Sequence, residues 1–331
     1  MIISKTPYRI SFFGGGTDYP VWYKEHGGSV LSTTIDKYCY ISCRRLPPFF
    51  KHKFRIAYSR IESVNEPGEI EHPSVREVLK WASLDCGLEI HHDGDLPARS
   101  GLGTSSSFTV GMINAIRAHQ GFMTSKKQLA CDALKIEQEC IKEDVGSQDQ
   151  VAVAYGGFNR IDFYQSGEFS VSPIIAPTDR LQALNDNLLL FFTGVTRFSA
   201  AFAKNKIKNL SQREKELFAM RDMVEQAVHI VSDRTRSLDT FGDLLHEAWR
   251  CKKSLSSTVS TPEVDEWYEK ARQAGALGGK LLGAGGGGFM LFYVPQEKQD
   301  SVKAMLSCLV HVPFSFERAG STIEMYEPNG L

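Results

Sequence analysis

The sequence predicts an α+β fold divided into two domains, on three observations. At 331 residues the chain is longer than one ordinary hydrophobic core supports. Its first part mixes strand patterns with long helices, and its second part is mostly helical before a glycine-rich segment and final strands. The pattern is interrupted around residues 165–190, which contain Pro173 and Pro177. We therefore expect one domain over residues 1–175 and another over residues 176–331.

The strands and helices of the first domain follow from hydrophobic spacing. Residues 2–13, 28–45, 53–59 and 88–93 read as strands, the first of them half-buried because Ile10 and Phe12 alternate with polar neighbours. One helix begins at His72-Pro73-Ser74. The residues expected to face inward in that helix are Val75, Val78, Leu79 and Ala82.

A second helix of this domain is expected from Thr124-Ser125 onward. Ser125 and Gln128 have the spacing of a capping box, which satisfies free N–H groups at a helix start. The inward-facing residues of this helix are expected to be Leu129, Ala133, Ile136 and Cys140.

The second domain is expected to be helical from about residue 199 to residue 275. One of its helices begins at Thr261-Pro262 and ends at Gly275, because proline is favoured in the first helical turn and glycine just past the end. The apolar run from Phe289 to Val294 then reads as a buried strand.

Composition excludes several classes of function. The net charge of −1, from 38 basic and 39 acidic residues, provides no bulk field to recruit nucleic acid or a membrane. The start of the sequence lacks a signal-peptide core, and no apolar run approaches the length of a membrane span. We expect a cytoplasmic protein, a monomer or homodimer, that acts on a small molecule.

The phosphate loop, residues 96–107, is the segment most indicative of function. It reads Leu-Pro-Ala-Arg-Ser-Gly-Leu-Gly-Thr-Ser-Ser-Ser, and the apolar positions Phe108, Met112 and Ala115 behind it predict a helix. Glycines allow close approach of the backbone to an anion, and the first turn of a helix offers unpaired N–H groups. The segment lacks the Gly-Lys-Ser/Thr ending of a P-loop and the spacing of a dinucleotide-binding turn.

Two other segments complete the pattern. The acceptor loop, residues 14–19, follows the first strand as Gly14-Gly15-Gly16-Thr17-Asp18-Tyr19, so Arg9 before it and Asp18 within it can face one cleft. The glycine turn, residues 280–288, is the end of a stretch with eight glycines between Gly275 and Gly288. A stretch so poor in side chains indicates that backbone comes close to another group there.

Together these segments resemble the three motifs of the GHMP kinases, the superfamily of galactokinase, homoserine kinase and mevalonate kinase. The resemblance covers nearly the whole chain. It implies a two-domain fold with an N-terminal ribosomal-protein-S5-like α/β domain and a C-terminal ferredoxin-like α+β domain. It also implies transfer of a phosphoryl group from ATP, which requires positioning and charge neutralisation by Mg²⁺.

The resemblance also assigns roles to residues. Arg9 occupies the basic position of the first motif, and the segment Gly146-Ser147-Gln148-Asp149-Gln150 resembles the Gly-x-x-Asp-Gln of galactokinases. Asp149 is thereby implied to accept the acceptor hydroxyl's proton or to orient that hydroxyl next to Arg9. Glu137, twelve residues before Asp149, and the Ser105 hydroxyl are implied to hold Mg²⁺. The residues implied to bind the ATP phosphates are Gly101, Leu102, Gly103, Thr104, Ser105, Ser106, Gly285 and Gly286.

The acceptor is expected to be a sugar, because Thr17-Asp18-Tyr19 matches the galactokinases, in which the aspartate binds sugar hydroxyls. Gly14-Gly15-Gly16 replaces their Gly-Glu-His, and the chain is most similar to the branch that contains D-glycero-D-manno-heptose 7-phosphate kinase and the kinase portion of L-fucokinases. The turn carrying Arg197 also resembles that branch. The implied substrate-binding residues are Gly15, Gly16, Thr17, Asp18 and Arg197.

We expect phosphorylation of the anomeric hydroxyl of heptose 7-phosphate to the 1,7-bisphosphate. The acceptor's own phosphate would need basic contacts. The candidates are Arg44, Arg45, Lys51, Lys53, Arg55 and Arg197.

Three alternatives stay open at this point. The acceptor is L-fucose-like or another free hexose, or the chain is a non-catalytic sugar-binding sensor, which would have no reason to keep Ser105, Glu137 and Asp149 together. A dinucleotide oxidoreductase would also use glycine turns, but no G-x-G-x-x-G opens a βαβ unit here.

Overall fold

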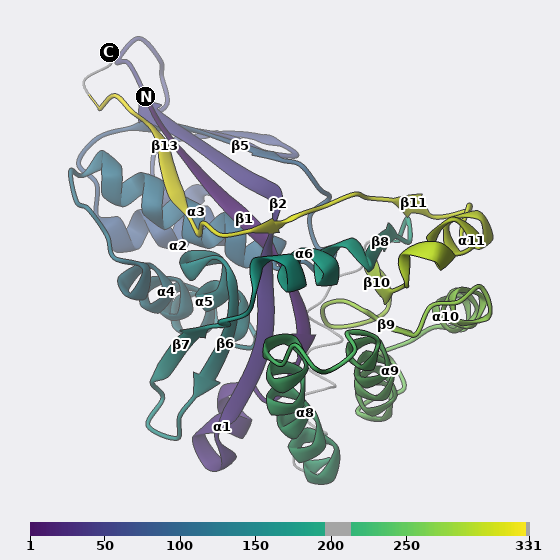
Figure 1. Cartoon of the computed structure of the whole chain (residues 1–331). Coiled ribbons are helices and arrows are strands. Elements are labelled where there is room, and N and C mark those ends of the chain that lie inside the picture. Colours follow the sequence, from purple (N-terminus) through teal and green to yellow (C-terminus); the bar gives the residue numbers. More distant parts are fainter. Residues whose placement is uncertain (196–212, 329–331) are drawn as a thin grey trace.

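The computed structural model describes residues 1–195 and 213–328, in which nine strands form a first sheet and four form a second (Figure 1). The strands of the first sheet are β1 (Ile2–Phe13), β2 (Gly28–Arg45), β3 (Phe54–Ala57), β4 (Ile61–Val64), β5 (Leu88–Gly94), β6 (Phe158–Phe163), β7 (Phe169–Pro173), β12 (Phe316–Glu317) and β13 (Thr322–Tyr326). The strands of the second sheet are β8 (Leu188–Phe192), β9 (Gly278–Leu281), β10 (Phe289–Tyr293) and β11 (Val310–His311).

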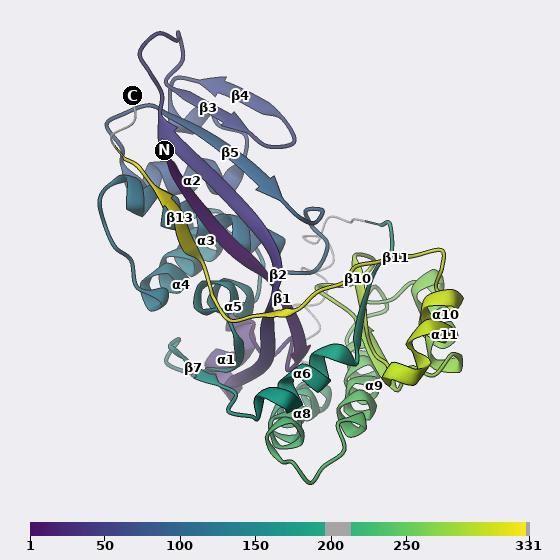
Figure 2. The same ribbon diagram turned by 45° about the horizontal axis from the view of Figure 1, so that its top comes forward.

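Helices pack on both sheets (Figures 1 and 2). The α-helices are α1 (Pro20–His26), α2 (Pro73–Ala82), α3 (Thr104–His119), α4 (Lys126–Leu134), α5 (Gln148–Tyr155), α6 (Thr178–Asp186), α8 (Glu214–Ser232), α9 (Asp239–Ser254), α10 (Pro262–Gln273) and α11 (Gln299–Met305). The short helical segments are η1 (Pro67–Glu69), η2 (Lys135–Cys140) and η3 (Gln296–Lys298). This mixture of helix and sheet confirms the predicted α+β class. Among the described residues, no helix is long and apolar enough to cross a membrane.

The first sheet is built on the long antiparallel pair of β1 and β2. Its order is β13-β1-β2-β5-β3-β4, with β6 and β12 also pairing β2. Among the described strands, only β3 and β5 pair in parallel. The strand predictions for residues 2–13 and 28–45 are confirmed, whereas the strand predicted for residues 53–59 spans only 54–57. Helix α3 packs against β1 and β2, with its predicted inward residues Phe108, Met112 and Ala115 buried.

Strand β1 is not half-buried as predicted, because both of its faces are covered between Thr6 and Phe13. Its polar residues Arg9 and Ser11 are 3% and 7% exposed. Successive side chains of a strand point to opposite faces, so Arg9 and Ser11 share one face. The alternation of polar and apolar residues therefore marks polar groups turned into the protein rather than toward bulk solvent.

The helix predicted from Ser125 onward changes its winding after Leu134. Ser125 caps α4 as predicted, since its hydroxyl accepts a hydrogen bond of 3.2 Å from the backbone N–H of Gln128. The continuation η2 is a π-helix, which turns each residue through a smaller angle than an α-helix. Cys140 consequently lies on the surface, so its predicted inward position is wrong, while Glu137 turns inward.

The second sheet carries α9, α10 and α11, which share one hydrophobic core with β8 and β10. Helix α10 begins as predicted, with the Thr261 hydroxyl accepting a hydrogen bond of 3.3 Å from the N–H of Val264. Strand β10 is wholly buried, as its apolar sequence predicts. The described helices α8, α9 and α10 confirm the helical prediction within residues 214–273.

The chain returns to the first sheet after completing the second. Strand β12 pairs with β2, and β13 pairs with β1 along its outer edge (Figure 2). The boundary predicted between residues 175 and 176 falls between β7 and α6 and stays a prediction. Strands β12 and β13, from beyond that boundary, thus complete the first sheet. Helix α3, which follows the phosphate loop, packs against the same sheet.

Candidate active site

An ion pair between Arg9 and Asp149 joins β1 to the first turn of α5. Arg9 Nε lies 2.8 Å from Asp149 Oδ1, and Arg9 Nη2 lies 2.7 Å from Oδ2, a bidentate arrangement. The Arg9 side chain is 4% exposed and the Asp149 side chain 26%. Such paired bonds fix the plane and orientation of the carboxylate. Asp149 therefore presents a positioned carboxylate at a partly open surface, with a guanidinium behind it.

Arg9 also contacts the phosphate loop. Its Nη1 donates a hydrogen bond of 2.7 Å to the carbonyl of Gly101, and its backbone N–H donates one of 3.0 Å to the carbonyl of Leu102. A Cβ on Gly103 would lie 3.1 Å from Arg9 Cγ, and Gly103 has a φ of +71°. Glycine at this position allows the loop to pass over the arginine in a left-handed conformation.

The phosphate loop leads directly into α3, as the sequence predicts. Thr104 is the first residue of α3, and its hydroxyl accepts a hydrogen bond of 3.0 Å from the N–H of Arg99, so it stabilises the turn. Ser105 is exposed and Ser106 is buried. The start of α3 lies beside the Arg9–Asp149 pair, where a helix N-terminus favours an anion.

The acceptor loop is held in place mainly by its own side chains. Thr17, fully buried, donates to the carbonyls of Gly14 and Ser29 at 2.8 and 3.0 Å. The Asp18 carboxylate accepts a hydrogen bond of 2.8 Å from the N–H of Gly16 and one of 3.0 Å from Gln148 Nε2. Asp18 is 2% exposed, and its role as a sugar ligand remains a prediction.

The glycine turn packs against the phosphate loop backbone to backbone. A Cβ on Gly283 would lie 2.5 Å from Gly101 Cα, and one on Gly288 would lie 2.3 Å from the carbonyl oxygen of Ser100. The N–H of Phe289 donates a hydrogen bond of 3.1 Å to that same carbonyl. Segments nearly two hundred residues apart thus meet in one place, as the sequence predicts.

Gly285 and Gly286 are the two glycines of this turn that the resemblance implies in binding the ATP phosphates. In the structure both contact the Val259 backbone. Gly286 donates its N–H to the carbonyl of Val259 at 3.2 Å, and a Cβ on Gly285 would lie 2.8 Å from the Val259 backbone. The structure therefore places both against the segment before α10. Their part in binding ATP stays a prediction.

The close approach of the two loops leads to a stability prediction. Gly288→Ala is expected to lower the free energy of unfolding by about 2–4 kcal/mol, because φ is +107° and the new methyl would overlap the Ser100 carbonyl. Urea unfolding measures the loss. Gly121→Ala is the matched control, with φ of +80° but nothing within 4 Å of the new methyl, and should lose only about 1 kcal/mol. Equal losses would show that the contact between the loops contributes nothing.

Glu137 is a buried carboxylate beneath the first turn of α3. It is 1% exposed, and burial raises its pKa to about 7 although hydrogen bonds from Gln150 and Ser106 oppose the shift. Ser106 Oγ donates to Glu137 Oε2 at 3.1 Å, and Gln150 Nε2 donates to the same oxygen. Within the described residues, the other oxygen, Oε1, has no hydrogen-bond partner.

These observations fit a divalent cation at Glu137. An orphaned buried carboxylate oxygen is costly unless a proton or a cation satisfies it. The described residues contain no cluster of three histidine, cysteine or acidic side chains, but Mg²⁺ bound to a nucleotide needs only one or two protein groups beside phosphates and water. Ser106 contacts Glu137 directly. Ser105, the predicted partner of Glu137, precedes Ser106 in α3 and is exposed. The assignment of Ser105 to the metal remains a prediction.

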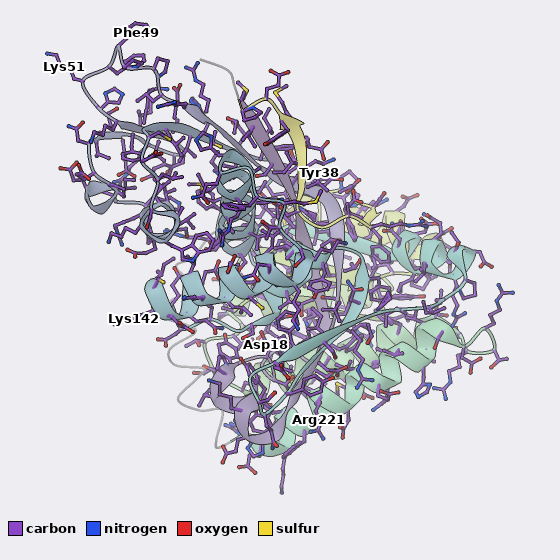
Figure 3. The ribbon with its side chains drawn as sticks, turned by 90° about the vertical axis from the view of Figure 1, so that its left-hand side faces the viewer. Asp18, Tyr38, Phe49, Lys51, Lys142 and Arg221 are labelled. Atoms are coloured by element: carbon purple, nitrogen blue, oxygen red, sulfur yellow. The ribbon has the colours of Figure 1, made fainter. Side chains whose placement is uncertain are left out.

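Three of the basic residues considered for a second phosphate, Arg44, Arg55 and Lys51, lie away from the acceptor loop or pair elsewhere. Arg44 and Arg55 both pair with Glu89 on β5. Figure 3 shows Lys51 at the tip of a loop at one end of the molecule, away from Asp18. Arg197 lies outside the described residues and stays a prediction.

Two buried lysines support the loops and were not assigned from the sequence. Lys252 of α9 donates from Nζ to the carbonyls of Leu281 and Gly283 at 2.6 and 2.7 Å. Lys280 donates to the carbonyls of Ser11 and Phe12 at 3.0 and 2.7 Å, at the end of β1. The position of Lys280 at the start of the glycine turn was the only signal in the sequence; Lys252 sits in an ordinary helical pattern.

Comparisons with known proteins agree with this arrangement. Residues 73–157 match the family model of the GHMP kinases N terminal domain, and residues 219–311 match that of GHMP kinases C terminal. The chain is 31% identical over 331 residues to D-glycero-alpha-D-manno-heptose 7-phosphate kinase of Campylobacter jejuni, covering 96% of this chain and 97% of that one. It is 27% identical to a galactokinase of Thermococcus kodakarensis, with 90% of each chain covered.

Solved structures show the same fold. A D-glycero-D-manno-heptose 1-phosphate kinase from Bacteroides thetaiotaomicron superposes with a TM-score of 0.80 at 23% identity, covering 99% of this chain and 100% of that one. A putative sugar kinase from Campylobacter jejuni superposes with a TM-score of 0.72 at 26% identity, covering 97% of both chains. The likeness extends across both sheets and their helices.

Proposed function

Because the chain belongs to the GHMP kinase family and is a sugar kinase, we propose that it transfers the γ-phosphoryl group of ATP to the anomeric hydroxyl of D-glycero-D-manno-heptose 7-phosphate. The product is the 1,7-bisphosphate. The observation that carries the chemistry is the Arg9–Asp149 pair at the junction of the phosphate loop and the acceptor loop. The relative of 31% identity, a heptose 7-phosphate kinase, supports the acceptor.

Each described group has a part in the proposed transfer. The acceptor oxygen forms a bond to the γ-phosphorus while the bond from that phosphorus to the bridging oxygen of ADP breaks. Asp149 accepts the hydroxyl proton or orients the hydroxyl, and Arg9 stabilises the negative charge of the phosphoryl group in transit. The N-terminus of α3 and the phosphate loop hold the phosphates.

Glu137 and a serine hydroxyl would hold a Mg²⁺ ion that accompanies the nucleotide. When bound, the ion would neutralise phosphate charge. Two features support this proposal as oxygen ligands for the ion: the orphaned Oε1 of Glu137 and the neighbouring serine hydroxyls of α3.

An acceptor screen tests the proposed substrate. The purified protein with Mg²⁺ and ATP is offered heptose 7-phosphate, L-fucose, D-galactose and D-mannose, and each product is identified by NMR. We expect turnover of the heptose phosphate with the new phosphate on the anomeric oxygen. Faster turnover of a free sugar would overturn the proposed acceptor in favour of the second candidate, an L-fucose-like or other hexose kinase. Relatives that are fucokinases and galactokinases favour that candidate.

Substitution of the two neighbouring serines tests the metal assignment. Ser105→Ala is expected to raise the Mg²⁺ concentration for half-maximal rate about tenfold, because one oxygen ligand is lost. Ser106→Ala is the matched comparison: it removes the 3.1 Å hydrogen bond to Glu137 and should cost about 1 kcal/mol of stability. Magnesium titrations of initial rate measure the metal requirement of both variants, and urea unfolding measures their stability. A raised requirement only in Ser106→Ala would transfer the role to Ser106.

A further inference from the structure

The side chain of Lys252 extends from α9 to the point where β9 ends and the glycine turn begins. Its ammonium group donates hydrogen bonds to the carbonyls of Leu281 and Gly283, at 2.6 and 2.7 Å. Leu281 is the last residue of β9, and Gly283 has a φ of +72°, a left-handed conformation that turns the chain away from the strand. Lys252 is 5% exposed, so both bonds are shielded from solvent. One side chain thus fixes the direction in which the glycine turn leaves β9.

Helix α9 provides a rigid base for this contact. It packs against β9 (Figure 1), and Trp249, three residues before Lys252, is fully buried in the core of the second sheet. The Lys252 ammonium lies 5.9 Å from the centre of the Trp249 ring. Lys253, the next residue, pairs instead with Asp265 at 3.1 Å, and 35% of its side chain is exposed. The two neighbouring lysines therefore have different surroundings, which makes Lys253 a suitable control.

The residues that Lys252 holds touch the phosphate loop. Leu282 lies between the two bonded carbonyls, and a Cβ on Gly101 would lie 2.6 Å from the Leu282 carbonyl oxygen. A Cβ on Gly283 would lie 2.5 Å from Gly101 Cα. Leu282 and Gly283 are therefore in direct backbone contact with Gly101, so a shift of the glycine turn would move Gly101.

Gly101 in turn fixes the guanidinium of Arg9. Its carbonyl accepts a hydrogen bond of 2.7 Å from Nη1, while Nε and Nη2 of the same group hold Asp149 at 2.8 and 2.7 Å. A guanidinium is planar, so a carbonyl that fixes one of its nitrogens also fixes the direction in which the other two donate. The orientation of the Asp149 carboxylate therefore depends on the position of Gly101.

We propose that Lys252 is a positioning residue for phosphoryl transfer. It holds the glycine turn against Gly101, and Gly101 sets the orientation of the Arg9–Asp149 pair. The inference rests on the proposed function, in which that pair carries the transfer. Transfer is sensitive to such positioning, because a displacement of about 1 Å at the reacting groups can cost about 10²-fold in rate. Lys252 lies outside the three segments that resemble the family motifs.

The start of α3 is anchored independently of Lys252. Ser107 Oγ lies within hydrogen-bond distance of the carbonyls of Pro7 and Gly103, at 2.9 and 3.0 Å, and α3 packs against β1 and β2. The N–H groups proposed to hold the ATP phosphates therefore keep their place when the glycine turn shifts. Loss of the Lys252 ammonium should slow the transfer and leave the binding of ATP and sugar nearly unchanged.

Steady-state kinetics of Lys252→Met test this difference between rate and binding. With whichever sugar the wild type phosphorylates, kcat is expected to fall about tenfold or more, while both KM values stay within about threefold. Two controls should keep kcat within about twofold. Lys253→Met removes a charge from the same helix, and Arg180→Met removes a cation that donates to the carbonyls of Ile230 and Val231. A kcat of Lys252→Met within about threefold of the wild type, or an equal fall in Arg180→Met, would overturn the proposal.

A double-mutant cycle tests whether the loss passes through Asp149. Single-turnover rates are compared for Lys252→Met, Asp149→Asn and the double variant. Because Lys252 acts by orienting the Asp149 carboxylate, its substitution should add less than about twofold to the loss in the Asp149→Asn background. Fully multiplicative losses would overturn the proposed route.

A spectroscopic measurement makes the test independent of the reaction. In protein containing isotope-labelled arginine, the NMR signal of the buried Arg9 Nε–H is assigned by its absence in Arg9→Lys. Its exchange with solvent is expected to be about tenfold faster in Lys252→Met and unchanged in Lys253→Met. Exchange within about twofold of the wild type would overturn the positioning role. Absence of turnover with every sugar would instead overturn the proposed function and leave this measurement standing.

A milder variant covers the case in which Lys252→Met does not fold. Lys252→Gln keeps one amide donor for the two carbonyls, and it is measured by the same kinetics and the same exchange experiment. Changes of about threefold or more, in the same directions, are expected. Wild-type values in both measurements would overturn the proposal.

Discussion

The Asp149→Asn variant is expected to bind ATP nearly as tightly as the wild type and to transfer the phosphoryl group about 10³-fold more slowly. General acid–base groups contribute factors of this size, and an amide cannot take the hydroxyl proton. The loss should come from the Asp149 carboxylate itself, because both of its oxygens accept hydrogen bonds from Arg9 and the side chain is only partly exposed. Nucleotide affinity by calorimetry and single-turnover rates separate binding from transfer.

Stability must be measured beside activity, because Asp149→Asn leaves Arg9 without its counter-charge. Removing one partner of a largely buried pair destabilises a protein, so a loss of about 1–3 kcal/mol is expected. Asp162→Asn is the matched control, as Asp162 also pairs with an arginine, Arg160 at 2.9 Å, but lies on β6. Turnover in Asp149→Asn within tenfold of the wild type would remove Asp149 from the chemistry.

Glu137→Gln is expected to lose efficient use of the magnesium nucleotide while becoming more stable than the wild type at high pH. Gln lacks the charge that holds a divalent cation, so the Mg²⁺ concentration for half-maximal rate should rise about 100-fold or more. Magnesium titrations at saturating sugar measure this change. An unchanged magnesium requirement would contradict the metal assignment.

The stability effect follows from the raised pKa of Glu137. Burial raises it from 4.5 to about 7, so the folded protein holds a proton that the unfolded chain has released between those values. The unfolded state then binds fewer protons, and stability falls as pH rises through this window. In metal-free wild-type protein the loss is on the order of 3 kcal/mol by pH 8. Glu137→Gln should not show this loss of stability. The kcat/KM of the wild type should rise with pH through an inflection near 7.

Glu89 provides a control, because its pKa is shifted in the direction opposite to that of Glu137. It is also buried, but contacts with Arg44, Arg55 and His91 hold its pKa at about 2. Its stabilisation is present above the ordinary carboxyl pKa and is lost as pH falls through the folded value. Glu89→Gln should therefore destabilise the protein at neutral pH. Urea unfolding from pH 5 to pH 8, without metal, measures how stability changes with pH in both variants. Glu89→Gln should keep the wild-type fall of stability with rising pH and Glu137→Gln should lose it, so parallel slopes would contradict the burial of charge at Glu137.

Local patterns in the sequence predicted the elements that carry the site. The glycines and hydroxyls of the phosphate loop, the cap at Ser125 and the apolar run of β10 depend on neighbouring residues, so spacing alone indicates them. The convergence of the three segments came from a family resemblance rather than from spacing. The structure brings Arg9, Asp149 and the phosphate loop into contact as that resemblance implied.

Other features depend on interactions that spacing does not encode. The π-helical winding of η2 turns Glu137 inward and Cys140 outward, and no local signal separates it from an α-helix. The contact of Ser106 with Glu137 depends on which residues of one helical turn face a segment thirty residues away. The contacts of Lys252 and Lys280 with backbone carbonyls require the tertiary fold, because a buried lysine resembles a surface lysine in the sequence.

The pairing of β13 with β1 affects the order in which the chain can assemble. The first strand is flanked on one side by β2 and on the other by residues 322–326, which are translated more than three hundred residues later. Until those residues leave the ribosome, the edge of β1 is an unpaired row of amides, the kind of template that recruits foreign strands. The first sheet therefore cannot be completed along residues 2–5 of β1 until the last part of the chain has been synthesised.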